Sequence, residues 1–94
     1  MPDEKVRGRK KHPEGRPPIV KKFGLLIRRL RKEAGLSQEE FAYRAKYHRT
    51  YQTFIESGAK TPSIETARKQ AEVLNLRLSQ LFALLEDDEG SIHN

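Results

Sequence analysis

The sequence predicts an all-α fold in which five short helices surround one small core. Apolar residues recur at steps of three and four from about residue 19 to residue 86, which is helical spacing. Residues typical of helix starts and ends interrupt this stretch, and no segment alternates with period two, so we expect no β-sheet. With 94 residues, 35% of them hydrophobic, the chain has room for one domain.

The first two expected helices are separated by a glycine. The apolar face of the first is formed by Phe23, Ile27, Leu30 and Ala34. Gly35 ends this helix, because glycine readily takes the left-handed conformation found there. Ser37 starts the second helix three residues before Glu40, the spacing of a capping box. The inner face of the second helix is formed by Phe41, Ala42 and Ala45.

Three more helices complete the expected bundle. The third runs from Arg49 to Ser57 and stops at Gly58. Ser63 is a suitable N-cap for the fourth helix, and Asn75 a suitable C-terminal cap. The apolar face of the fourth is formed by Ile64, Ala67, Ala71 and Leu74. That of the fifth is formed by Leu78, Leu81, Phe82 and Leu85.

Charge divides the chain into a basic arm, a basic body and an acidic tail. Residues 1–18 hold four prolines, two glycines and six Lys or Arg, so we expect a disordered basic arm. Residues 19–86 form the helical domain, and residues 87–94 are expected to be an acidic tail. The net charge of +6 favours a polyanionic partner such as DNA, since basic side chains that neutralise phosphates release counterions.

Several functional classes are poorly supported. The chain has no cysteine, and its three histidines lack metal-ligand spacing, so we expect no metal and no cofactor. No glycine-rich phosphate loop and no catalytic constellation stand out, so we expect no enzyme. The longest apolar run, residues 81–85, is too short for a membrane span. We expect a cytoplasmic protein with no membrane association and no small-molecule ligand.

Residues 35–62 carry the most specific pattern. They contain GLSQEEFA at the start and IESG at residues 55–58, and PSIETA follows at residues 62–67. In order and spacing these segments resemble the phage-repressor-like (Cro/repressor, XRE-type) helix-turn-helix family. The resemblance implies a five-helix DNA-binding domain. It further implies a transcription regulator that binds double-stranded DNA as a homodimer on a pseudo-palindromic operator.

A shorter pattern points to one branch of the family. AYRA at residues 42–45 and HRTY at residues 48–51 resemble the controller proteins of restriction-modification systems. An alternative is an antitoxin-type regulator that also binds a protein partner, with the proline-rich arm as the partner-binding segment. A purely structural interaction module is a third hypothesis, against which the basic body argues.

The resemblance makes the third helix the recognition helix, which enters the major groove with its N-terminal end on base edges. The residues placed toward DNA are His48, Arg49, Thr50 and Thr53. Arg49 is expected to bind guanine through two hydrogen bonds, with phosphate binding as the alternative. Gln38, at the start of the second helix, is expected to hold the DNA backbone.

Three residues depart from the family pattern. Lys46 replaces the usual turn glycine and must take a strained left-handed conformation unless the turn differs. Tyr47 replaces a small aliphatic residue. Gln52 stands where most members bury Ile or Val, and two interpretations stay open. Either the helix is rotated so that Tyr51 and Phe54 are buried and Gln52 binds adenine, or Gln52 lies at a semi-buried edge.

Two further sets of residues have expected structural roles. Arg31 and Glu56 match positions that form a partly buried ion pair in the family, which would fix the recognition helix. The dimer interface is expected on the fifth helix, at Leu81, Leu84 and Leu85. Leu84 lies on a different helical face from the residues assigned to the core, which makes it the best candidate for the seam.

Overall fold

The protein is an all-α bundle, as the sequence predicts. The computed structural model describes residues 17–93, with side chains through residue 87. The described residues form five helices and no strand. The helices are α1 (Pro18–Glu33), α2 (Gln38–Ala45), α3 (Arg49–Ser57), α4 (Ile64–Val73) and α5 (Leu78–His93). None of them is both long enough and apolar enough to cross a bilayer.

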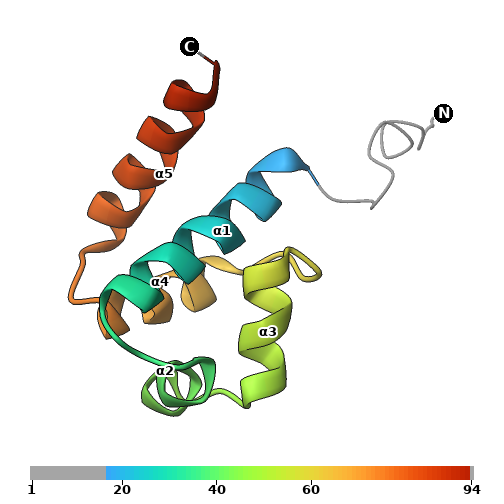
Figure 1. The fold of residues 1–94 in the computed structure, drawn as a ribbon, viewed down its shortest axis with the longest axis vertical. Helices are drawn as coiled ribbons and strands as arrows, with labels where there is room; N and C mark the ends of the chain where they lie inside the picture. The colour runs from blue at the N-terminus through green and yellow to red at the C-terminus, as the bar shows by residue number, and fades with distance from the viewer. Residues whose placement is uncertain (1–16, 94) are drawn as a thin grey trace, which may run out of the picture.

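Helix α1 is the centre of the bundle (Figure 1). It packs on α3 on one side and on α5 on the other. Helix α2 packs on α3 and α4, and α4 also contacts α5. Helices α2 and α3, joined by a short turn, therefore lie together at one end of the molecule, while α5 lies at the other.

Local sequence signals set the helix ends. The Ser37 hydroxyl accepts a hydrogen bond from the Glu40 backbone N–H, and the Glu40 carboxylate accepts one from the Ser37 backbone N–H, which confirms the capping box. At the start of α4 the Ser63 hydroxyl accepts a hydrogen bond from the Thr66 backbone N–H. Gly35 and Gly58 take positive φ angles of 76° and 81° at the ends of α1 and α3.

Two residues other than glycine also take the left-handed conformation. Lys46, with φ 65°, ends α2, and Asn75, with φ 60°, follows α4. Asparagine tolerates this conformation, but lysine adopts it at a modest cost. The turn that joins α2 to α3 therefore keeps the geometry of a glycine turn although it contains none.

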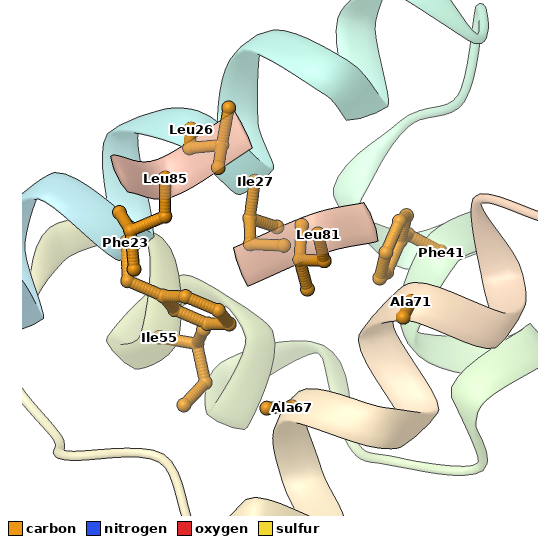
Figure 2. Packing of buried hydrophobic residues seen from close by; sticks show 9 residues of the cluster. All are labelled: Phe23, Leu26, Ile27, Phe41, Ile55, Ala67, Ala71, Leu81 and Leu85. Carbon is orange, nitrogen blue, oxygen red and sulfur yellow. The ribbon is translucent and has the colours of Figure 1, made fainter. Parts of the chain in front are cut away.

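The core lies where α1, α3, α4 and α5 meet, with one aromatic ring from α2 (Figure 2). It consists of Phe23, Leu26, Ile27, Phe41, Ile55, Ala67, Ala71, Leu81 and Leu85. Gly24 allows α1 to approach α3 closely. A Cβ atom on Gly24 would lie only 2.5 Å from the Ile55 carbonyl oxygen and 2.6 Å from that of Glu56. Glycine is therefore required at this crossing.

The expected dimer seam on α5 needs correction. Leu81 and Leu85 are 0% and 5% exposed and fill the core of the protomer, so they are not available to a second chain. Leu84 is half-buried against the same core. Phe82, expected inside, is 38% exposed. The apolar face of α5 is wider than the part that α1 and α4 cover. Helical spacing alone does not predict which edge of that face stays exposed to solvent.

Other expectations also differ from the structure. Ala34, assigned to the apolar face of the first helix, is exposed at the C-cap of α1. Ile64, assigned to the inner face of α4, is 75% exposed at the first position of that helix. Helix α5 continues past the expected boundary at residue 86 through His93, and no proline is present there to end it. Pro18, expected in the arm, is the first residue of α1, where proline is well tolerated. The rest of the expected arm, residues 1–16, lies outside the described residues.

Candidate nucleic-acid interface

The start of α3 is presented to solvent by the turn that precedes it. His48 is the N-cap of α3, and its Nδ1 accepts a hydrogen bond from Thr50 N–H at 3.1 Å. Because Nδ1 accepts in this bond, the other ring nitrogen, Nε2, remains for a partner outside the helix. His48, Arg49, Thr50 and Thr53 are all exposed. The structure thus gathers these four predicted residues on one surface.

An open groove of about 600 Å³ runs between α1, the start of α2 and the exposed side of α3. It is lined by Arg28, Arg31, Ser37, Gln38, Glu39, Arg49, Thr53, Glu56 and Ser57. Four of these, Arg28, Ser37, Glu39 and Ser57, were not predicted as part of the site. Arg28 lies one turn before Arg31 in α1, in a basic stretch where the sequence alone does not single it out. The groove carries the cations of Arg28 and Arg49 and the amide of Gln38, which suit a phosphate backbone, beside the exposed carboxylate of Glu39.

Gln38 is held in place from both ends of its amide. Its Nε2 donates to Glu56 Oε1 at 3.0 Å, and its Oε1 accepts from the Thr53 hydroxyl at 3.0 Å. The Thr53 hydroxyl also lies 3.2 Å from the Arg49 carbonyl oxygen. An amide carries two N–H donors, so Gln38 keeps a second one for an acceptor such as a phosphate oxygen.

Glu56 joins the three helices beneath the groove. Arg31 donates to it twice, from Nε to Oε2 at 2.7 Å and from Nη2 to Oε1 at 3.0 Å. Burial by itself raises the pKa of Glu56, but hydrogen bonds from Arg31, Gln52 and Gln38 outweigh burial and lower the pKa below its ordinary value. Arg31 also donates to the Leu36 carbonyl at 2.8 Å. The pair expected from the resemblance is thus a bidentate, buried contact between α1 and α3.

Gln52 does not face DNA. It is 0% exposed, and its amide pairs with Gln70 of α4 and donates to Glu56 Oε2 at 3.0 Å. The expectation that Gln52 binds a base is therefore wrong, because a buried partner on another helix takes up its amide. The rotated-helix interpretation is wrong too. Phe54 is 37% exposed, with the Lys60 ammonium 5.5 Å from its ring centroid, so it does not enter the core.

Tyr47 and Tyr51 close the other side of α3. Their rings meet edge to face with centroids 4.9 Å apart, and the Tyr51 hydroxyl lies 3.2 Å from Thr66 Oγ1. The Lys69 ammonium lies 5.2 Å from the Tyr47 ring centroid. In residues 17–87 no group of His, Asp or Glu side chains is arranged to hold a metal ion.

Comparison with known proteins agrees with this geometry. Residues 27–81, more than half of the chain, match the family model described as helix-turn-helix. The chain belongs to the helix-turn-helix family. It is a DNA-binding regulator of the XRE type, which confirms the resemblance seen in its sequence.

Relatives of this helix-turn-helix protein include named control proteins. It is 38% identical over 68 residues to control protein C.MunI of a Mycoplasma species, covering 71% of this chain and 92% of the relative. It is 43% identical over 61 residues to the ImmF control region 10 kDa protein of Bacillus phage phi105, covering 65% of this chain and 68% of the relative.

Solved structures show the same fold. The restriction-modification controller protein C.AhdI from Aeromonas hydrophila shares 35% identity, with a TM-score of 0.62 over 67% of this chain and 94% of that one. The controller protein C.Esp1396I, solved as a tetramer in complex with its natural 35 base-pair operator, shares 25% identity. Its TM-score is 0.71 over 76% of this chain and 93% of that one.

Proposed function

We propose that this helix-turn-helix protein is a restriction-modification controller that binds a pseudo-palindromic operator as a homodimer. The observation that carries the proposal is the exposed start of α3. Arg49, Thr50 and Thr53 are exposed there, and the helix beneath them is fixed by the buried Arg31–Glu56 pair. The likeness to C.MunI and C.AhdI supports the controller assignment over an antitoxin.

In this proposal α3 enters the major groove, and its first residues meet the base edges. Arg49 binds guanine O6 and N7 with its planar guanidinium, and Thr50 contacts a neighbouring base. Gln38 and Arg28 border the groove beside α3 and hold phosphate oxygens. Base and backbone contacts thus come from different helices, which fixes the register of α3 on the duplex.

The second chain of the dimer is proposed to cover an apolar surface at the starts of α1 and α4. Ile19 and Ile64 are exposed there, and Phe82 of α5 lies beside them. The three side chains border an apolar depression of about 190 Å³. Exposed apolar side chains gathered in one place favour a protein interface. Leu84 lies two residues after Phe82, on the other edge of α5, and does not line this depression.

We also propose that the protein acts by binding alone, without catalysis, and that it works in the cytoplasm. Regulation of a promoter requires only that the protein occupy or leave its operator. Two recognition helices held one helical turn of DNA apart supply the contacts for specific binding.

Binding-site selection from random duplex DNA tests the proposal. We expect one enriched sequence with two inverted half-sites, protected by purified protein in footprinting. Recovery of sequences without a common motif would contradict specific DNA recognition. A single unrepeated half-site would contradict the dimer.

A further inference from the structure

Two glutamine side chains are buried face to face between α3 and α4. Gln52 and Gln70 are both 0% exposed. Gln52 Nε2 donates to Gln70 Oε1 at 3.1 Å, and Gln70 Nε2 donates to Gln52 Oε1 at 2.8 Å. A buried amide is costly unless it is hydrogen-bonded. Each glutamine therefore depends on the position of the other.

The amide pair is connected to the groove by further hydrogen bonds. Gln52 uses its second N–H to donate to Glu56 Oε2 at 3.0 Å. The other oxygen of Glu56 accepts from Gln38, whose Oε1 accepts from the hydroxyl of Thr53. A continuous series of hydrogen bonds thus leads from Gln70, inside the bundle, to Thr53 on the exposed side of α3.

The amide pair is the main directional contact between α3 and α4. Helix α3 packs chiefly on α1 and α2, and its other bond to α4 joins the hydroxyls of Tyr51 and Thr66. Hydrogen bonds require a narrow range of distance and angle, whereas apolar contacts are non-directional and tolerate small rotations. Rotation of α3 about its axis would separate the two amides. The pair therefore resists the motion that would redirect Arg49 and Thr50.

We propose that Gln70 is a positioning residue for DNA sequence recognition, which acts through Gln52 and Glu56 to fix the rotation of α3. Gln70 itself is buried and does not contact DNA. The inference rests on the proposed DNA-binding function and adds a determinant of specificity outside the recognition helix. It also gives the buried Gln52 a role, because an apolar residue at this place would pack against α4 without fixing an angle.

Operator discrimination tests this role. Two operators are compared, the selected one and one in which the base pair contacted by Arg49 is changed. The discrimination ratio is Kd for the changed operator divided by Kd for the selected operator. In Gln52→Leu/Gln70→Leu both amides are removed together, so neither is left without its partner, and Glu56 Oε2 loses the Gln52 donor but keeps the hydrogen bond from Arg31 Nε. We expect the discrimination ratio to fall about five- to tenfold. A loss of this size corresponds to one base-reading side chain that no longer makes its contact. Affinity for random duplex DNA should change less than twofold.

Two further variants separate positioning from stability. Gln70→Asn keeps an amide but shortens it by one methylene, so it cannot keep both bonds to Gln52, and discrimination should fall. Val73→Ala is the matched control, since Val73 is a half-buried α4 residue that packs against the core. It should lower the denaturation midpoint but leave the discrimination ratio unchanged.

The outcomes are distinguishable. Unchanged discrimination in the folded double variant would overturn the inference, as would an equal loss in Val73→Ala. If the double variant does not fold, Gln70→Asn provides the test. A reduced discrimination ratio in that variant supports the inference, and an unchanged ratio overturns it. If the wild-type protein does not discriminate among sequences, the proposed function fails first, and this inference fails with it.

Discussion

Arg31 of α1 and Glu56 of α3 form a bidentate ion pair across 25 residues of sequence, with both side chains more than nine-tenths buried. The pair lies directly beneath the groove, and Gln38 and Gln52 complete the hydrogen bonds to the carboxylate. Each oxygen of Glu56 thus accepts two bonds. Removal of Arg31 would therefore leave the Glu56 carboxylate buried without a counter-charge.

Arg31→Met should lower the free energy of unfolding by about 3–5 kcal/mol, because it leaves the Glu56 carboxylate buried without its counter-charge. Urea denaturation followed by circular dichroism measures this. Arg68→Met is the control, since Arg68 pairs with Glu65 and Glu72 on the exposed side of α4 and should matter little. If Arg31→Met and Arg68→Met lower the free energy of unfolding equally, burial does not make the fold more dependent on the Arg31 pair than on the exposed one.

Stability should also depend on pH through Glu56. Its pKa is lower in the folded chain than its ordinary value of 4.5, so its contribution is complete above about pH 4.5 and is lost as pH falls toward the folded pKa. We expect Glu56→Gln to flatten the dependence of unfolding free energy on pH as pH falls below the ordinary value of 4.5. Glu40, whose pKa is lowered by hydrogen bonds from Ser37, leaves a residual slope. An unchanged slope in Glu56→Gln would contradict the assignment.

Arg49 and Arg28 should affect DNA binding in different ways. Arg49→Ala should cost roughly 1–3 kcal/mol on the selected operator and relax the preference at one base pair. Arg28→Gln should weaken all sequences alike and reduce the slope of log affinity against log salt by about 0.9, the value for one phosphate that is no longer neutralised. Fluorescence anisotropy on operator and random duplexes at several salt concentrations measures both. If Arg49→Ala weakens random DNA equally, Arg49 binds phosphate instead.

The dimer should depend on the exposed apolar side chains near the start of α4. Ile64→Glu places a charge in the proposed seam without disturbing the core, so we expect monomers at tens of micromolar. Sedimentation velocity measures this, and circular dichroism confirms that the helices remain. Leu25→Glu is the matched control, because Leu25 is exposed on α1 but does not line the apolar depression. A dimer that survives Ile64→Glu would place the seam elsewhere.

Deletion of residues 1–16 tests the basic arm expected from the sequence. We expect helix content and oligomeric state to stay unchanged, since α1 begins at Pro18. Affinity for all DNA should fall, and the salt slope should flatten by about 0.9 for each phosphate that the arm neutralises in the full-length protein. Equal affinity and equal salt slope in the two proteins would show that the arm takes no part in binding.

Much of the fold could be predicted because its signals are local. Ser37 and Glu40 are three residues apart, so the capping box that starts α2 is visible in the sequence. The left-handed helix ends at Gly35 and Gly58 could be predicted because glycine takes this conformation most readily. The exposed start of α3 was predicted from the resemblance to the helix-turn-helix family, which made α3 the recognition helix.

The features that could not be predicted depend on residues that are distant in the sequence and become neighbours only in the folded chain. Gln52 looks like an exposed polar residue until Gln70, 18 residues later, is placed against it. Gly24 gives no sign of its role until α3 crosses α1 at that point. The sequence by itself determined the helices, their ends and the family. Only the tertiary structure decided which edges of the apolar faces are covered and which polar groups are buried, because burial depends on neighbours that helical spacing does not specify.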